Sequence, residues 1–125
     1  MEQSINEIII NNVAYIQKDT VKVMPKMTEN YVVIRSDRAG VHVGELVSST
    51  DTVHGKEVVL KNTRRIFYWS GAATLSQLAL EGVKNPNNCK FTVEIPVNNI
   101  MGVIEIIPCS AEAVANIKGV PIWKS

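Results

Sequence analysis

The sequence predicts an α+β fold: a mainly antiparallel β-sheet, built from a meander plus an N-terminal hairpin, covered by one or two short helices. Three observations predict this class. Short apolar runs alternate with polar residues as strands do, Asn, Asp and Gly separate these runs, and two segments carry helix-capping residues. With 125 residues, of which 46% are hydrophobic, the chain forms one domain over 1–125. We divide it into a ribbon (1–20), a core (31–110) and a short helix with an apolar tail (111–125).

The ribbon at residues 1–20 is expected to be a β-hairpin. Its stretch "EIIINNVAYIQKD" also fits a helix, because Ser4 and Glu7 have the spacing of a capping box. Asn11 and Asn12 favour the hairpin, since asparagine tolerates the positive φ of a two-residue turn. We therefore expect one strand on each side of this turn.

A meander follows. "YVVIRS" (31–36) and "VHVGELVSS" (41–49) read as strands on either side of a turn that ends at Gly40. A loop over 49–55 leads to the strand "KEVVL" (56–60). A further turn through "KNT" leads to "RRIFYWS", whose alternation places Arg65, Phe67 and Trp69 on one face and Arg64, Ile66 and Tyr68 on the other.

Two helices are signalled by their ends. In the first, Thr74 and Gln77 form a capping box and Gly82 stands where a left-handed C-cap belongs. In the second, "SAEAVANIKG" begins with the N-cap Ser110 and ends with Gly119. We expect short helices between these caps.

The segment between the helices is expected to contain two strands. "KFTVEIP" (90–96) alternates Phe91, Val93 and Ile95 against polar residues, which predicts a half-buried strand that ends at Pro96. "GVIEII" reads as the second strand. The final "VPIWKS" carries an apolar tryptophan that docks on its own domain or on a neighbouring subunit.

Charge and composition exclude several classes of function. The formal net charge of +1 offers no overall field for a nucleic-acid polymer or an anionic membrane. The N-terminus lacks the basic start of a secretory signal, and no apolar run is long enough for a membrane span. Neither Cys89 nor Cys109 has the close Cys/His spacing of a zinc site. We expect a protein of the reducing cytoplasm of a host cell, without a metal or cofactor.

Catalytic motifs are absent from the sequence. It contains no nucleophile elbow, no His-Glu-x-x-His, no Walker loop and no Gly-x-Gly-x-x-Gly. His42 lies within a predicted strand and His54 in a predicted loop, where Asp51 could pair with it. We expect a protein that is not an enzyme; a reaction that uses one of these histidines is the alternative.

The corner "RRIFYWSGAATLSQ" combines cations, aromatic rings and a helix start. Guanidinium groups bind phosphate oxygens, small residues at a helix N-terminus admit an anion, and aromatic rings stack on nucleobases. The alternative is purely structural, since aromatics at a strand end usually fill the core and small residues relieve crowding. The candidate ligand-binding residues are Arg38, Arg64, Arg65, Phe67, Trp69, Gly71, Thr74, Asn85 and Asn88.

The block from "GKEVVLKNTRRIFYWSGAATLSQLALEGV" to "VIEIIPCS" resembles a family of small phage and prophage proteins with the pattern "VVLK-ARRIWYW-GA-TL-LA-GV". The resemblance covers roughly residues 31–110. In style the chain also resembles anti-defence sponges of the Thoeris anti-defence 1 type. That resemblance implies a homo-oligomer that binds a cyclic nucleotide signal, such as a cyclic ADP-ribose isomer, and holds it without cleavage. It transfers no pocket residue to this chain. The alternative function is a phage virion or assembly accessory protein that acts through protein–protein contacts.

Overall fold

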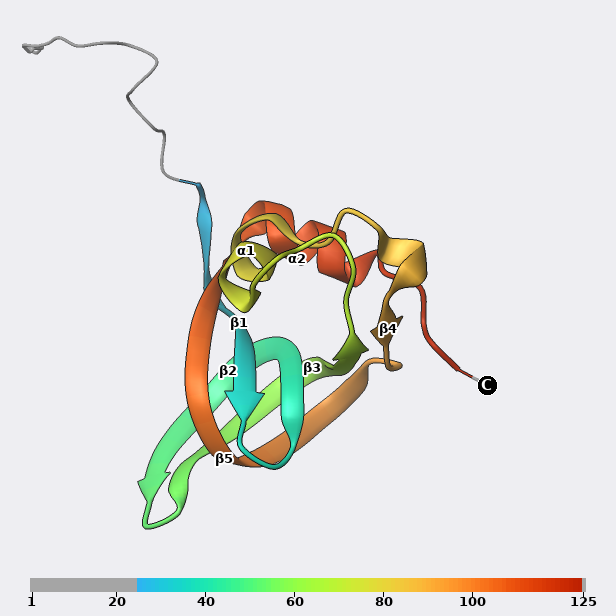
Figure 1. The fold of residues 1–125 in the computed structure, drawn as a ribbon. Coiled ribbons are helices and arrows are strands. Elements are labelled where there is room, and N and C mark those ends of the chain that lie inside the picture. The colour runs from blue at the N-terminus through green and yellow to red at the C-terminus, as the bar shows by residue number, and fades with distance from the viewer. Residues whose placement is uncertain (1–24, 125) are drawn as a thin grey trace, which may run out of the picture.

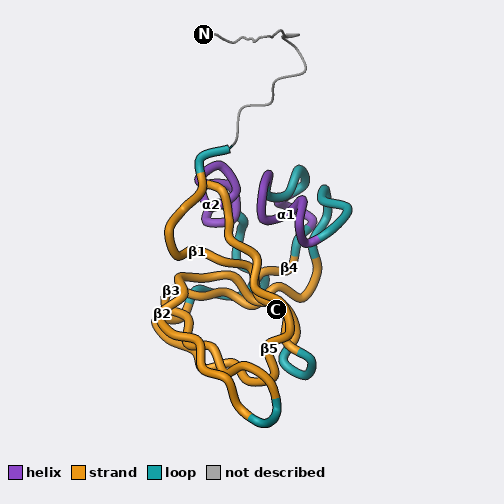
Figure 2. Tube along the Cα trace, turned by 90° about the vertical axis from the view of Figure 1, so that its left-hand side faces the viewer, coloured by secondary structure: helices purple, strands orange, loops and turns teal. Residues whose placement is uncertain are grey.

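The computed structural model describes residues 25–124, and it confirms an α+β fold composed mostly of strand. The antiparallel sheet has the order β2-β1-β5-β3-β4, and β2 also pairs with β3. Strands β1, β2, β3 and β5 therefore form a closed ring, with β4 attached to β3, and both helices lie at one end of the strands (Figures 1 and 2). The elements are β1 (Met27–Ser36), β2 (Gly40–Thr52), β3 (Gly55–Tyr68), α1 (Leu75–Glu81), the 3-10 turn η3 (Pro86–Asn88), β4 (Lys90–Phe91), β5 (Ile95–Ser110) and α2 (Ala111–Lys118).

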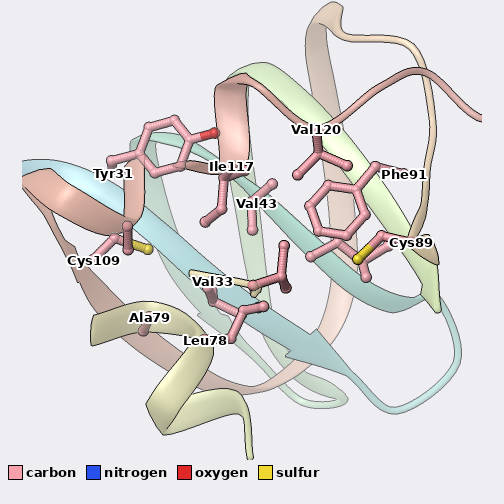
Figure 3. Close-up of a cluster of buried hydrophobic side chains, with 13 residues drawn as sticks. Tyr31, Val33, Val43, Leu78, Ala79, Cys89, Phe91, Cys109, Ile117 and Val120 are labelled. Carbon is pink, nitrogen blue, oxygen red and sulfur yellow. The ribbon is translucent and has the colours of Figure 1, made fainter. Parts of the chain in front are cut away.

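Strand β1 shows why the apolar run "YVVI" is unbroken. Val32 and Ile34 pack inside the ring, whereas Tyr31 and Val33 face the helices, so both faces of the strand are buried. The ring interior also contains Val58, Leu60, Ile100 and Val103. Figure 3 shows the second cluster, the helix-side cluster. In it, Val33 and Val43 of the sheet contact residues of both helices, including Leu78, Ala79 and Ile117.

Both predicted helices are confirmed with the predicted N-caps; Gly82 ends α1 at a positive φ, but its ψ of -156° lies outside the left-handed helical region that was expected. The Thr74 hydroxyl accepts a hydrogen bond from the Gln77 N–H at 3.1 Å, and the Gln77 side chain accepts one from Ala73. Gly82 ends α1 with a φ of 78° and donates its N–H to the Leu78 carbonyl. The Ser110 hydroxyl accepts from the Ala113 N–H at 3.0 Å and starts α2.

The meander β1–β2–β3 is confirmed, but two predicted interruptions are wrong. The expected loop over 49–55 is mostly strand, because β2 continues to Thr52 and pairs there with Gly55. The expected turn through "KNT" is a bulge within β3, where Asn62 takes a φ of 48° and the register with β2 shifts. The Asn62 side chain donates to Glu45 of β2 at 3.0 Å, which anchors the bulge.

The expected strand over 90–96 is wrong in its extent. Only Lys90 and Phe91 form β4, and a separate strand, β5, begins at Ile95 and contains Pro96. Phe91 is buried as predicted, but Val93 and Ile95 are exposed. The predicted strand over 102–107 is confirmed as the second half of β5.

The predicted N-terminal hairpin lies outside the described residues. Within residues 25–124 no helix is long and apolar enough to cross a membrane.

Candidate functional site

The two arginines of the corner point to opposite sides of β3. Arg64 is paired with Val43 of β2, and Val43 and Ile66 belong to the cluster that faces the helices. Arg65, between Arg64 and Ile66, is paired with His42. Because side chains alternate along a strand, Arg65 and His42 face the other way, toward the mouth of the ring.

Arg64 is buried, and its guanidinium donates hydrogen bonds to backbone carbonyl oxygens. Nε donates to the Thr92 oxygen at 2.7 Å, and the terminal nitrogens donate to the oxygens of Ile117, Phe91 and Pro121. Burial lowers the pKa of Arg64 from its ordinary value. The expectation that Arg64 binds a ligand phosphate is therefore corrected: it joins β4, the C-terminal end of α2 and the tail.

Gly71 does not leave an open path to the helix N-terminus. It has a φ of 95°, and a Cβ placed on it would overlap the backbone of Lys84 and Asn85. The Asn85 amide donates to the Ser70 hydroxyl at 3.2 Å, and its carbonyl accepts from Asn88. The expectations of a phosphate site at Gly71 and of ligand-binding amides at Asn85 and Asn88 do not fit this packed corner.

Trp69 and Thr74 line a separate hollow of about 380 Å³. The Trp69 indole N–H donates to the Ala72 carbonyl at 3.2 Å, and its ring packs against the helix-side cluster. Arg35 lies in the same hollow but pairs with Glu105 at 3.3 Å. The arginine of this hollow is already paired, and neither Trp69 nor Thr74 lines the cleft that Arg65 faces, so both are removed from the candidate site.

A larger cleft of about 790 Å³ lies on the side of β3 that Arg65 faces. It is formed by the β1–β2 turn, the tip of the β2–β3 hairpin, β3 and the middle of β5. Arg38 and Arg65, which the sequence analysis selected, both line it. The remaining lining residues are Asp37, Ala39, His42, His54, Asn98, Asn99, Ile100, Met101 and Gly102.

Arg65 has free hydrogen-bonding capacity in this cleft. Within the described part of the chain, no carboxylate or carbonyl oxygen accepts a hydrogen bond from its guanidinium, which lies 4.7 Å from the ring centre of Phe67. A guanidinium stacked on a ring keeps its N–H edge available for an anion. Arg65 is therefore the residue best placed to bind a phosphate.

His42 forms a buried wall of the cleft. Its Nε2 donates to the Ala39 carbonyl at 2.9 Å, because a carbonyl can only accept, and this leaves Nδ1 as an acceptor in the neutral ring. Nδ1 has no partner among residues 25–124. Burial lowers the pKa of His42, and the neighbouring Arg65 lowers it further.

Phe67 and Trp123 form an aromatic platform beside the cleft. Their ring centres are 5.5 Å apart at an interplanar angle of 62°, an edge-to-face arrangement. Phe67 is 51% exposed and Trp123 46% exposed, so both rings retain contact area for a ligand. The Lys90 ammonium lies 5.3 Å from the Trp123 ring, which adds a second cation beside that of Arg65.

His42, Asn98 and Asn99 line the cleft and Trp123 lies beside Phe67, a grouping that the sequence does not predict. The alternation "VHV" signals that His42 faces away from its valine neighbours, but nothing local signals that β5 and the tail lie next to it. In the portion that the structure describes, no three His, Cys, Asp or Glu side chains are grouped to hold a metal ion.

The model of a domain of unknown function, DUF6948, matches residues 29–117. The chain belongs to that family. No curated protein and no solved structure matches this chain. The matched residues include the whole cleft lining and both Arg64 and Arg65, and they end before Trp123.

Proposed function

We propose that this protein binds a small nucleotide and sequesters it without cleavage. The observation that carries the proposal is the position of Arg65, which lines the cleft on one side and stacks on Phe67 of the aromatic platform on the other. A nucleotide requires both features, because its phosphate needs a cation and its base needs a flat apolar surface.

The cleft residues fit the remaining parts of such a ligand. Arg38 supplies a further cation within the cleft, and the amides of Asn98 and Asn99 can exchange hydrogen bonds with sugar hydroxyls. A volume of about 790 Å³ accommodates a dinucleotide-sized ligand. The phage-family resemblance gives the biological setting: sequestration of a cyclic nucleotide immune signal, such as a cyclic ADP-ribose isomer, in the cytoplasm of a bacterial host.

Sequestration is favoured over catalysis by the state of the two histidines. His42 is buried, its burial lowers its pKa, and its Nε2–H is donated to the Ala39 carbonyl. His54 is exposed at the tip of the β2–β3 hairpin. Neither forms a hydrogen bond to a carboxylate within residues 25–124, so no oriented acid–base pair supports hydrolysis.

The test is to incubate the purified protein with cyclic mononucleotides and cyclic ADP-ribose isomers, remove unbound material, denature the protein and identify the released compounds by mass spectrometry. The proposal predicts intact ligand at near-stoichiometric yield. Chemically altered ligand would establish an enzyme instead. Retention of no ligand would reject nucleotide binding.

A second candidate function is that of a virion or assembly accessory protein. It is favoured by the segment over 93–101, which leads into β5 and forms its first half: Val93, Ile95 and Val97 are all exposed, next to Met101 at 66% exposure. Exposed apolar groups concentrated on one strand are typical of protein–protein contact surfaces. Co-purification of the tagged protein with capsid or tail proteins from infected cells would support this function.

A further inference from the structure

The C-terminal tail, residues 120–124, docks along β4 as an additional extended segment. Val120 is buried in the helix-side cluster, and Ile122 forms a parallel bridge with Phe91. The Trp123 N–H donates to the Phe91 carbonyl at 2.8 Å. In Figure 1 the tail leaves α2 and passes beside β4. The backbone of the tail is therefore fixed up to Trp123.

Arg64 anchors this tail through hydrogen bonds. One terminal nitrogen donates to the Ile117 oxygen at 3.0 Å, and the other donates to the Pro121 oxygen at 3.3 Å. Nε donates to the Thr92 oxygen, just after β4. A single planar guanidinium thus joins the end of α2, the tail and the segment beside it, which the single ammonium of a lysine could not do.

The docked tail brings Trp123 to Phe67 and leaves nearly half of the indole uncovered. Core packing does not account for this position, because a buried tryptophan side chain would be worth more to folding than one at 46% exposure. A rigidly held, half-exposed tryptophan beside the Lys90 ammonium is instead an efficient surface for an aromatic anion, since little side-chain entropy is lost on binding.

We infer that Trp123 is a ligand-binding residue that stacks on the base of the bound nucleotide, and that Arg64 is the residue that positions it. This inference rests on the proposed function. It assigns distinct tasks to the two adjacent arginines: Arg65 binds the ligand phosphate, while Arg64 fixes the tail that carries the base-binding ring.

The test compares the binding of cyclic ADP-ribose and of inorganic pyrophosphate, by calorimetry, to the full chain and its variants. Trp123→Ala should weaken cyclic ADP-ribose binding by about 10-fold or more, in line with the loss of one base-stacking contact, and leave pyrophosphate binding unchanged. Trp123→Phe should restore most of the affinity, because it retains a ring.

The role of Arg64 has a readout that does not depend on ligand. Arg64→Lys keeps the charge but loses the planar guanidinium that bonds to several carbonyl oxygens. The Trp123 backbone amide should therefore exchange its hydrogen faster than in the parent. Cyclic ADP-ribose binding should weaken as it does in Trp123→Ala. Unchanged exchange at that amide would overturn the positioning role.

The outcomes separate this inference from the function on which it rests. A parent protein that binds neither probe would reject nucleotide binding, and with it the ligand role of Trp123. If Trp123→Ala bound cyclic ADP-ribose as tightly as the parent does, the assignment of Trp123 alone would be overturned. The same would follow if Trp123→Ala lost affinity equally for cyclic ADP-ribose and pyrophosphate.

Discussion

At the scale of single residues, the surroundings of Arg64 and Arg65 differ although the two are neighbours in the chain. Arg64 is 4% exposed and donates to four carbonyl oxygens, whereas Arg65 faces a cleft with its guanidinium stacked on Phe67. Strand alternation separates them, and the helices cover only one side of β3. The same side chain therefore stabilises the fold at one position and is available to a ligand at the next.

Arg65→Gln should abolish most nucleotide binding without unfolding the protein, because it removes the cation that lies between the cleft and the aromatic platform. A charge-assisted contact of this kind contributes about 1.5–3 kcal/mol, which corresponds to a loss of about 10- to 150-fold in affinity. The measurement is calorimetric titration, with circular dichroism to check folding. The matched control is Arg35→Gln, which removes an exposed arginine paired with Glu105; an equal loss in this control would contradict the assignment.

His42 makes stability depend on pH. Its pKa is lowered from 6.5 in the folded protein by burial, so the unfolded chain binds more protons between its own pKa and the lower folded value. The free energy of unfolding should therefore decrease as pH falls below about 6.5 and level off below the folded pKa. His42→Gln should remove this part of the slope in urea unfolding between pH 7 and 5.

The control for this pH series is His54→Gln, which removes an imidazole from an exposed position. A slope that persists unchanged in His42→Gln would show that another group is responsible.

At the scale of elements, Asn116 joins α2 to the segment that follows α1. Asn116 of α2 accepts a hydrogen bond from the Val83 N–H at 2.8 Å and donates its amide to the Val83 carbonyl at 2.9 Å. A Cβ at Gly82 would overlap this amide, so the glycine that ends α1 also admits Asn116. These two hydrogen bonds between Asn116 and Val83, the Asn116 joint, fix the chain direction after α1. They thereby fix the position of the packed corner at Gly71.

Asn116→Asp should lower the free energy of unfolding by about 1–3 kcal/mol, because it replaces the donor that faces the Val83 carbonyl with an oxygen and leaves that carbonyl unsatisfied. Urea denaturation measures the change. Asn87→Asp, at an exposed position of η3, is the matched control and should stay within about 0.5 kcal/mol of the parent. Equal effects at both positions would contradict the role of the joint.

Element boundaries show what local pattern could predict. The caps at Thr74, Gly82 and Ser110 act on backbone groups within a few residues, so the sequence contains all the information that places them. The bulge at Asn62 and the break after Phe91 depend on pairing with strands far along the chain. For that reason a bulge was predicted as a turn, and a single strand was predicted where the structure has two.

At the scale of the whole molecule, strand β5 closes the ring by pairing with β3 in its first half and with β1 in its second half. Where it pairs with β3 over 95–99, β1 does not pair with it. This part of the strand exposes Ile95 and Val97. An exposed apolar strand of this kind is a surface on which copies of the chain can associate.

Val97→Lys should therefore lower the mass of the protein in solution if it assembles as the proposed homo-oligomer, because a buried charge at the interface opposes association. Light scattering at several concentrations measures the mass. Val53→Lys, at the 93% exposed tip of the β2–β3 hairpin, is the control and should keep the parent mass. An oligomer that survives Val97→Lys would place its interface elsewhere.

The candidate site was only partly predictable. Arg38, Arg65 and Phe67 were selected from the sequence and line the cleft or the platform beside it. Arg64, Gly71, Asn85 and Asn88 were selected with them but are engaged in packing and backbone hydrogen bonds. Residue type indicates which chemistry a side chain can perform, while its availability depends on what the rest of the chain places around it.

The sequence by itself determined the α+β class, the meander and the ends of both helices, because alternation, turn residues and caps act over short distances. The tertiary structure alone decided which arginine faces solvent and that Trp123 lies beside Phe67. It also decided that β5 closes the ring. These outcomes depend on contacts between residues far apart in the chain, which burial and backbone pairing select together and which no local pattern encodes.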